Sequence, residues 1–322
     1  MKIFLNKKKL INFIKKEKNL GFVPTMGSIH LGHISLVKKS ISQCNKTIVS
    51  IFVNKQQFNK KIDYQKYPRS LKKDISLLKK LKIDYLYIPS NYQIYPDGPN
   101  KKIKISSFGK KLCGKFRPGH FRAVVDVIER FIKIIRPKKI YFGEKDMQQL
   151  KIIEHFVKKK YNKIKIIGCK TIREKNGVAY SSRNFLLNLK EKKIASKIYK
   201  VLINKKKNLI QKKISVDRIK NKIFELGVHK VDYIKLLDIN KLVKPCRKNR
   251  RYKILINKKK DLIQKKISVD GIKNKFFELG VHKVDYIKLL DINKLIKPYS
   301  KNKRYKIFIA YHLRTTRLID NI

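Results

Sequence analysis

The chain has 322 residues with 83 Lys+Arg against 22 Asp+Glu, a formal net charge of +61, and 42% of its residues are hydrophobic, including 16 Phe and 16 Tyr. This composition excludes a disordered basic tail and is enough for one large domain or two medium ones. The four cysteines share no C-x-x-C spacing, lysines break up the amino terminus before a signal-peptide core can form, and no apolar stretch reaches membrane-spanning length. We therefore expect a cytoplasmic protein with no membrane segment, disulfide framework or zinc knuckle.

The positive charge is spread along the chain. Residues 203–308 carry 32 basic and 9 acidic residues, net +23, which leaves +38 of the total +61 for the other 216 residues, a similar density. Lys exceeds Arg and comes with many Ile and Asn, a composition that AT-rich codons produce without selection for binding. Because a polyanion-binding face would concentrate the charge, we expect no specific nucleic-acid partner. A basic RNA-binding protein remains the rival class, although no RNP-like aromatic pattern or KH loop supports it.

The first segment that stands out is Asn19–Val37, which contains no Lys, Arg, Asp or Glu in its 19 residues. Its pattern predicts a short strand at Gly21–Val23, a glycine turn at Pro24–Gly27 and a helix that begins near Leu31. In α/β proteins this succession builds phosphate sites, because the first amides of the helix are free and its dipole favours anions.

Two histidines lie in this turn and helix start. His30 and His33 are three residues apart, so both project from one side of the first helical turn. There they could donate hydrogen bonds to a phosphate and stabilise charge on a pentacoordinate phosphorus. A metal pair and two ordinary surface histidines stay open as alternatives, although no carboxylate or Cys ligand lies nearby in the sequence.

Two further polar clusters follow apolar strands. The strand Thr47–Val53 runs into Asn54–Phe58, and the strand Lys139–Phe142 runs into Gly143–Asp146. If these strands are parallel neighbours of the first one, all three clusters lie at the carboxyl edge of one sheet, which is where ligands bind in open α/β folds.

Each of these clusters offers side chains suited to an acid and a nucleotide. Gln57, and Gln149 on the helix after the second cluster, could bind hydroxyls or a carboxylate without adding charge, and Lys145 supplies a cation for a phosphate. Each signal alone is weak, because a post-strand Asn or Gln is usually a turn residue. The agreement in position is the stronger argument.

Two basic loops complete the pattern. Arg117–Arg122 precedes a predicted helix at Phe121–Ile135 and is either a loop over the same crevice or a helix start. A hairpin is predicted at Thr171–Ser182, with a type I′ turn at Asn176-Gly177. It delivers two serines and an arginine, Ser181–Arg183, which suit a triphosphate tail, or else form a helix N-cap beside a solvated Arg.

The carboxyl-terminal part of the chain contains a duplication. Residues 203–255 and 256–308 are two copies of one 53-residue segment and are identical at 45 positions. Near-identity indicates a recent tandem copying, since a solenoid needs about three repeats to share a core. A tolerated accident is favoured over functional expansion. Each copy predicts a helix and two strands, at Ser215–Gly227, Asp232–Leu237 and Tyr252–Leu255 in the first copy and at Ser268–Gly280, Asp285–Leu290 and Tyr305–Ile309 in the second.

Taken together, these motifs resemble the pantothenate synthetase (pantoate–beta-alanine ligase) family of the HIGH-motif nucleotidylyltransferase superfamily. They occur in family order over nearly the whole chain, and the combination of PTMG-x-x-H-x-G-H, FGEKD-x-QQL and SSRN is specific to this family. The matching segments are Pro24–His33, Ser50–Phe58, Tyr67–Leu71, Ile94–Gly98, Arg117–Arg122, Phe142–Leu150, Ser181–Asn184 and Arg317–Asn321.

The resemblance implies a ligase that joins pantoate to beta-alanine in two steps, with MgATP as a substrate. The carboxylate of pantoate attacks the α-phosphorus, giving pantoyl adenylate and pyrophosphate, and the amine of beta-alanine then releases AMP. His33 would be the catalytic histidine, a proton donor; Gln57 and Gln149 would bind pantoate, and Gln57 would also meet beta-alanine. The residues implied to contact ATP are Met26, Gly27, Ser28, Ile29, His30, Leu31, Gly32, His33, Gly143, Glu144, Lys145, Asp146, Ile172, Tyr180, Ser181, Ser182 and Arg183.

The resemblance also implies the domain organisation. Residues 1–180 would form a Rossmann-like α/β domain with a parallel sheet that binds ATP and pantoate, and residues 181–322 a smaller α+β domain that closes over ATP and contains the duplication. A homodimer is the usual state of the family. Without one 53-residue copy the chain would have 269 residues, an ordinary family length. Because only the second copy continues into the family's ending, we expect the second copy to complete the domain. The first copy would be an insertion that is either displaced or competes for the same docking place.

Several positions depart from the family pattern. Lys55 and Gln56 replace a Pro-Met pair, Tyr180 replaces a Leu, and Ala123 replaces a Gly. A Lys beside pantoate could alter its affinity or point outward. Another adenylyltransferase of the superfamily and a decayed enzyme remain as rivals, and the glutamine pair and the intact motifs count against them.

Overall fold

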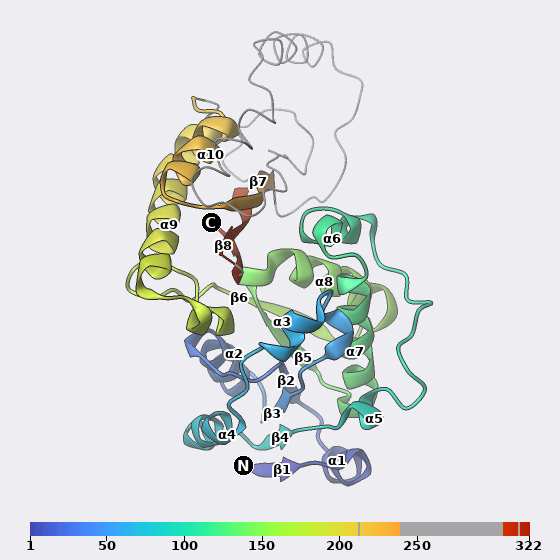
Figure 1. The fold of residues 1–322 in the computed structure, drawn as a ribbon. Helices are drawn as coiled ribbons and strands as arrows, with labels where there is room; N and C mark the ends of the chain where they lie inside the picture. Colours follow the sequence, from blue (N-terminus) through green and yellow to red (C-terminus); the bar gives the residue numbers. More distant parts are fainter. Residues whose placement is uncertain (212, 239–304, 315) are drawn as a thin grey trace. The chain divides into compact units, whose positions relative to one another are not determined.

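The computed structural model describes residues 1–211, 213–238, 305–314 and 316–322, and the chain divides into two compact units, Met1–Leu186 and Leu187–Ile322. The first unit contains a six-stranded sheet in which every pair of neighbours is parallel (Figure 1). This confirms the predicted Rossmann-like α/β fold. From one edge to the other the strands are β1 (Lys2–Phe4), β4 (Tyr85–Tyr87), β3 (Lys46–Ile51), β2 (Leu20–Thr25), β5 (Lys139–Gly143) and β6 (Lys165–Cys169).

Helices connect these strands, as parallel pairing requires. The α-helices of the first unit are α1 (Lys7–Ile14), α2 (Leu31–Ile41), α3 (Lys61–Gln65), α4 (Leu71–Lys80), α5 (Asn91–Ile94), α6 (Cys113–Phe116), α7 (His120–Ile135) and α8 (Met147–Lys160). Short 3-10 helices occur at η1 (Lys55–Gln57), η2 (Ser107–Lys110), η3 (Glu144–Asp146) and η4 (Ser182–Leu186).

The four central strands of the sheet, β2 to β5, are buried on both faces. On β2, Phe22 packs against Phe131 of α7 with ring centroids 5.3 Å apart, whereas the next residue, Val23, joins a buried cluster with Leu36 and Val37 of α2. Successive side chains of a strand point to opposite faces, so helices must cover both. In these central strands the ends remain open to a ligand, and the carboxyl ends carry the polar turns.

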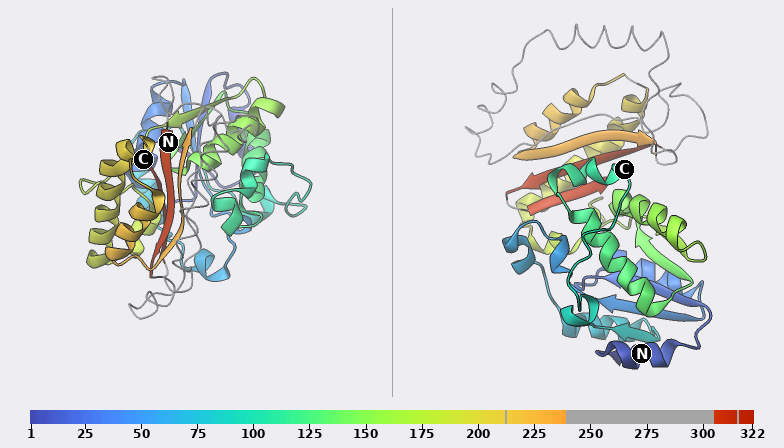
Figure 2. Two further views of the ribbon diagram at one scale, coloured as in Figure 1. Left: turned by 90° about the horizontal axis from the view of Figure 1, so that it is seen from above. Right: turned by 90° about the vertical axis from the view of Figure 1, so that its right-hand side faces the viewer.

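The second unit has two helices and a three-stranded antiparallel sheet, β7-β8-β9, in the part of it that the structure describes, and its long strands lie side by side in Figure 2. A buried ion cluster ties β7 to the other two strands, because Asp232 contacts Nε of Arg317 at 2.5 Å and Nε2 of His312 at 3.3 Å. Burial alone would raise the pKa of Asp232, but the adjacent His312 and the Arg317 charge hold it well below its ordinary value. The elements are α9 (Leu189–Ile210), α10 (Val216–Glu225), β7 (Lys230–Asp238), β8 (Tyr305–Leu313) and β9 (Thr316–Asn321).

The first copy of the duplication supplies α10 and β7 of this unit. Helix α10 lies within the predicted helix Ser215–Gly227 and is capped by Ser215, and β7 pairs with β8 from Lys230 to Asp238. The alternative that the first copy is displaced is therefore wrong, whereas the alternative that it competes for the docking place is compatible with this pairing. The second copy contributes its last residues to β8, and the other elements predicted for it, Ser268–Gly280 and Asp285–Leu290, lie outside the described residues, as does Tyr252–Leu255. Both copies carry the same strand sequence, so the pattern of residues could not decide between them.

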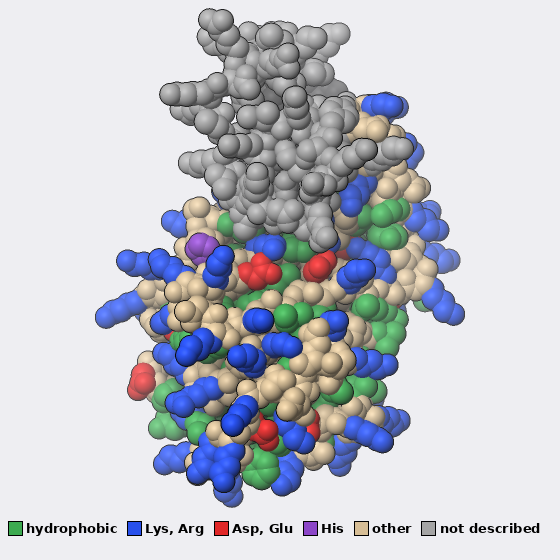
Figure 3. Space-filling view, turned by 180° about the vertical axis from the view of Figure 1, so that it is seen from behind, with side chains coloured by type: hydrophobic (Ala, Val, Ile, Leu, Met, Phe, Trp, Pro, Cys, Tyr) green, Lys and Arg blue, Asp and Glu red, His purple; other side chains and the backbone are tan. Residues whose placement is uncertain are grey.

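Lys and Arg side chains are spread over the face seen in Figure 3 and do not gather in one patch. None of the helices in the described part of the chain has the length and apolar character needed to cross a membrane.

Candidate active site

Three polar turns meet at the carboxyl edge of the six-stranded sheet. Strand β2 lies between β3 and β5, with Thr25 opposite Ile51 and Gly21 opposite Lys139. The predicted arrangement of parallel neighbours is confirmed, so the turns after these three strands share one edge. Strand β3 ends at Ile51, two residues before Val53, the predicted end of this strand.

The turn between β2 and α2 is fixed by side chains beneath it. Thr25 Oγ1 donates to the Ser50 carbonyl at 2.8 Å and accepts from the Gly27 amide at 3.1 Å. The next two amides, of Ser28 and Ile29, donate to the Asp74 carboxylate. The turn therefore enters α2 in one conformation, and the α2 amino terminus is held at the edge of the sheet.

His30 and His33 lie against each other at this helix start. Their rings are stacked, with centroids 4.0 Å apart and planes 22° apart, and each has a buried Nδ1 without a hydrogen-bond partner among the described residues. Burial and the positive charge of Lys145 lower the pKa of His30 to about 4, and burial, His30 and Lys145 hold the pKa of His33 well below its ordinary value. Both rings are neutral at pH 7.

The surroundings of the histidine pair suit an anion. His30 occupies the N-cap position of α2 without capping it by its side chain, so the amides of the first turn are left for another acceptor. The charge of Lys145, in η3, lowers the pKa of both histidines. Its Nζ lies 3.6 Å from Asp146 Oδ1. Phosphate oxygens would find free amides, two neutral imidazoles and an ammonium group there. Among the described residues, no three His, Cys, Asp or Glu side chains group together in a way that could hold a metal ion.

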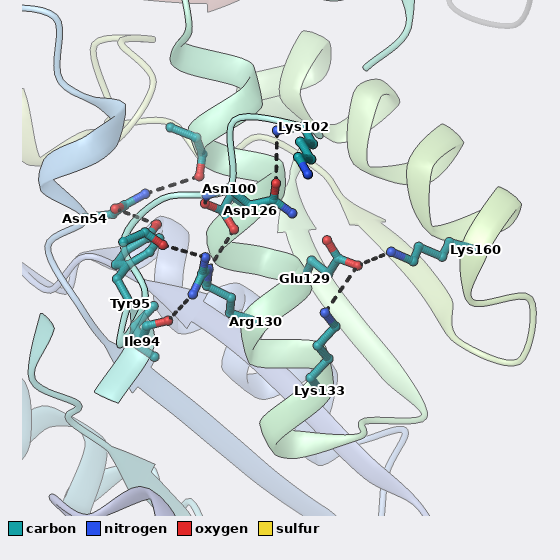
Figure 4. Close-up of polar contacts among 12 residues, drawn as sticks. Asn54, Ile94, Tyr95, Asn100, Lys102, Asp126, Glu129, Arg130, Lys133 and Lys160 are labelled. Atoms are coloured by element: carbon teal, nitrogen blue, oxygen red, sulfur yellow. Dashed lines mark hydrogen bonds and ion pairs between the residues drawn. The ribbon is translucent and has the colours of Figure 1, made fainter. Parts of the chain in front are cut away.

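Gln57 is joined to the same turn through its side chain. Its Nε2 donates to Met26 Sδ at 3.2 Å, and its Oε1 accepts from Asn54 Nδ2 at 3.2 Å. Asn54 is 1% exposed, and its Oδ1 accepts from the Tyr95 hydroxyl at 3.0 Å. The guanidinium of Arg130 stacks over the Tyr95 ring (Figure 4). This chain of contacts orients the side-chain amide of Gln57 so that its NH2 group points toward the β2–α2 turn.

The Arg117–Arg122 segment combines both of its predicted roles, because α7 begins within it at His120 and its basic residues reach the second turn. The Gln57 carbonyl accepts from Arg117 Nη2 at 3.0 Å and from His120 Nδ1 at 2.8 Å. Arg117 Nη1 lies 3.1 Å from His120 Nε2. A carbonyl can only accept and a guanidinium can only donate, so His120 carries its proton on Nδ1 and is neutral.

The two glutamines of the third turn have different environments. Gln148 is buried and binds the backbone of the η2–α6 region through the carbonyls of Phe108 and Lys111 and the amide of Cys113. Gln149, the predicted pantoate ligand, lies in the first turn of α8 and is partly exposed. Lys55 and Gln56, the residues that depart from the family pattern in the second turn, are both exposed.

The segment predicted as a hairpin has only one bridge among the described residues, between Arg173 and Ala179. The predicted type I′ turn is wrong, because such a turn needs two residues with positive φ and only Gly177 has one in this segment, at 90°. The Gly177 amide bonds to the Glu174 carbonyl, and the Asn176 side chain accepts from the Val178 amide. This is a type I turn closed by a left-handed glycine.

The residues that follow the Glu174–Gly177 turn pack on the β2–α2 turn. The Tyr180 ring is stacked on His30 with centroids 6.1 Å apart, and its amide donates to the Ile172 carbonyl. Ser182 is buried and lies 3.4 Å from the Ser28 carbonyl, to which its hydroxyl donates.

The helix-cap alternative holds for Ser181, which caps the start of η4, whereas Arg183 is paired and not simply solvated. Its Nη2 contacts the Asp63 carboxylate at 3.1 Å, and the Ser181 hydroxyl accepts from the Arg183 amide at 3.3 Å. A triphosphate would therefore compete with Asp63 for this guanidinium.

The sequence reasoning assigned no role to two residues that support the site from beneath, Asp74 and Tyr95. A usable signal existed for Asp74, which is buried with Leu78 four residues later on a helix whose other charged residues are lysines. Tyr95 lies in the family-matching segment Ile94–Gly98, but nothing local links it to Asn54, 41 residues earlier.

The chain matches known proteins over most of its length. The family model described as pantoate–beta-alanine ligase matches residues 2–264. The pantothenate synthetase of Sulfurihydrogenibium sp. is 34% identical over 314 residues, 97% of this chain and 95% of that protein, and that of Thermosipho africanus is 39% identical over 228 residues, 70% of this chain and 82% of that protein.

Solved structures agree with these matches. The pantoate–beta-alanine ligase of Francisella tularensis, crystallised with beta-gamma ATP and beta-alanine, is 32% identical and has a TM-score of 0.72, covering 100% of this chain and 97% of that one. The pantothenate synthetase of Thermus thermophilus is 26% identical with a TM-score of 0.75, covering 100% of this chain and 99% of that one.

Proposed function

The chain belongs to the pantoate–beta-alanine ligase family and catalyses the ATP-dependent condensation of pantoate with beta-alanine, and we propose that it does so where the three polar turns meet at the carboxyl edge of its six-stranded sheet. The observation that carries this assignment is the position of β2 between β3 and β5, which puts the turns after these three strands at one edge of the sheet. Gln57 of the second turn also contacts Met26 of the first.

The reaction proceeds in two steps in this proposal. A carboxylate oxygen of pantoate attacks the α-phosphorus of ATP, the bond to the bridging oxygen breaks, and pyrophosphate leaves with its electron pair. The amine of beta-alanine then attacks the acyl carbon of pantoyl adenylate, loses a proton and expels AMP. Both steps build negative charge on oxygen, so positioned donors and cations lower the barrier more than a protein nucleophile would.

The phosphates of ATP bind at the first turn of α2 in this proposal. The free amides of that turn, Lys145 and the two imidazoles are the donors, and Arg183 reaches the triphosphate after leaving Asp63. Neutral His33 donates one N–H bond to a phosphoryl oxygen. It becomes a donor of a full proton only when the negative charge of bound ATP offsets the burial and the Lys145 charge that keep its pKa low.

Pantoate binds beside the turn through the two glutamines. The Gln57 oxygen is engaged by Asn54, so its NH2 group faces the substrate with one N–H available beyond the Met26 contact. Gln149 supplies a second uncharged partner from α8. Uncharged amides suit this role, because they bind hydroxyls and a carboxylate oxygen without lowering the nucleophilicity of the carboxylate as a cation would.

Mg²⁺ enters as part of MgATP. In this proposal the phosphate oxygens would carry the ion, and Asp146, partly exposed beside Lys145, would be a carboxylate available to it. The family resemblance also leads us to propose a homodimer, which light scattering of the purified chain would test.

The experiment that tests the function uses the purified full chain with ATP, pantoate and beta-alanine. AMP release should require all three substrates, and pyrophosphate release should require only ATP and pantoate. AMP release that does not depend on pantoate would contradict the proposal. So would RNA binding at physiological salt with no ATP turnover.

A further inference from the structure

Asp74 is a buried carboxylate that lies beneath the candidate site. It belongs to α4 and is 1% exposed, and both of its oxygens are engaged by donors. Oδ2 accepts from the Ser28 amide at 2.8 Å, and Oδ1 accepts from the Ile29 amide at 2.8 Å and from the Ser70 hydroxyl at 3.1 Å. Two charge-assisted bonds thus run from one side chain to consecutive amides of the β2–α2 turn.

The backbone at this turn needs such support. Gly27 and Ser28 both have positive φ, at 78° and 52°, and the left-handed region is unfavourable for a serine. Such conformations persist only where the surroundings hold them. The space is also closed, since a Cβ on Gly27 would lie 3.0 Å from Asp74 Oδ2 and 3.2 Å from Ile51 Cγ2.

Successive amides in this kind of turn form a concave anion site. Here the protein fills that site with its own carboxylate, so the Ser28 and Ile29 amides point into the interior and are not offered to ATP. The amides left for a phosphate are those of the first turn of α2, which begins two residues after Ile29. His30 follows Ile29 directly, so the two hydrogen bonds from the Ser28 and Ile29 amides to Asp74 also fix the positions of His30 and His33.

We propose that Asp74 is a positioning residue for ATP: it acts as an internal anion that holds the Gly27–Ile29 backbone and so aims the α2 amino terminus and the His30–His33 pair at the phosphates. This inference rests on the proposed function, because it assigns ATP to that helix start. Asp74 does not touch substrate, and its effect passes through the turn.

The test replaces Asp74 by Asn, which keeps the shape but turns one oxygen into an NH2 group facing a backbone N–H. We expect the dissociation constant for ATP to rise at least about tenfold and kcat per folded molecule to fall about 100-fold, because a displacement near 1 Å has that order of effect. The KM for pantoate should change less than about threefold, because the Gln57 contacts with Asn54 and Met26 are untouched.

Asp84→Asn is the matched control. Asp84 also accepts a backbone amide, that of Thr47, at 2.8 Å, together with Lys46 Nζ at 2.9 Å, but it lies at the opposite, amino edge of the sheet. It should leave the dissociation constant for ATP unchanged. A residue that only stabilises the fold lowers the folded fraction and the melting temperature at unchanged ATP affinity, so unchanged ATP affinity in folded Asp74→Asn would overturn the inference.

Two milder variants keep the test decisive if Asp74→Asn does not fold. Ser70→Ala removes one of the three donors to Asp74 and should weaken ATP binding less than about threefold. Gly27→Ala disturbs the same carboxylate from the other side and should weaken ATP binding more strongly than Ser70→Ala does. Equal ATP affinity in both would contradict the inference. The wild type is measured alongside, since a wild type without pantoate-dependent ATP turnover would instead refute the proposed function.

Discussion

The imidazole of His33 lies stacked on that of His30, with ring centroids 4.0 Å apart, and both rings are kept neutral by burial and by Lys145. Neither Nδ1 has a hydrogen-bond partner in the part of the chain that the structure describes. Two neutral rings in contact are compatible, whereas two imidazolium ions at this distance would repel each other strongly.

This pair makes stability depend on pH. Both histidines have folded-state pKa values below the ordinary 6.5, so the unfolded chain binds more protons as the pH falls. The free energy of unfolding should therefore decrease as the pH drops from 6.5 toward about 4, by up to about 2 kcal/mol for His30 at pH 5. Urea unfolding of the wild type and of His30→Asn at pH 7 and pH 5 would measure this, and an equally steep decrease in both proteins would contradict it.

Asp63 should restrain ATP binding by holding Arg183. The pair is partly exposed, with Nη2 and Oδ2 3.1 Å apart, and such pairs contribute no more than about 1 kcal/mol. Asp63→Asn should therefore tighten ATP binding by about two- to fivefold, with less gain at high salt. Equilibrium binding of ATP at two salt concentrations tests this. Weaker ATP binding in Asp63→Asn would mean that Arg183 does not leave its partner for the phosphates.

Tyr95→Phe should affect pantoate more than ATP. The variant removes the hydroxyl that donates to Asn54, which in turn orients the Gln57 amide, and a lost hydrogen bond of this kind costs about 1 kcal/mol. We expect the KM for pantoate to rise about fivefold with little change for ATP. Tyr161→Phe is the control, because its hydroxyl binds Glu129 away from the site. The same increase in both variants would point to a general loss of stability.

A chain without Ile256–Phe308 should fold and remain active. This deletion keeps the first copy, with α10, β7 and the Asp232–Arg317 contact, and joins Leu255 to Ile309 so that YKIL replaces YKIF at the start of β8. AMP release and thermal unfolding should match those of the full chain. A folded but inactive deletion protein would show that the second copy takes part in the reaction.

The sequence was sufficient where structure is local and insufficient where it depends on distant contacts. The strand at Gly21–Val23 and the helix at Leu31 follow from neighbouring residues, and the structure has both. The predicted turn at Pro24–Gly27 starts two residues too early, because β2 continues to Thr25. Asp74, by contrast, acts on Ser28 from 46 residues away.

The copy that docks in the second unit could not be predicted for a different reason. The two copies carry the same residues at the positions of β7, so their local preferences are equal and only tertiary packing decides between them. The prediction of a type I′ turn was wrong because an Asn-Gly pair also suits a type I turn followed by a left-handed glycine. The structure has this second form, closed by the hydrogen bond from the Gly177 amide to the Glu174 carbonyl.

The most direct test of the site is the exchange of labelled pyrophosphate into ATP without beta-alanine, measured in the wild type, in His33→Ala and in the exposed-histidine control His155→Ala. Exchange in the wild type and in the control should depend on pantoate. His33→Ala should lower it by about 100-fold or more while the dissociation constant for ATP changes less than about fivefold, because His33 acts on charge that develops in the transition state. Exchange without pantoate, or an equal loss of exchange and ATP affinity in His33→Ala, would contradict the placement of adenylate formation at this histidine.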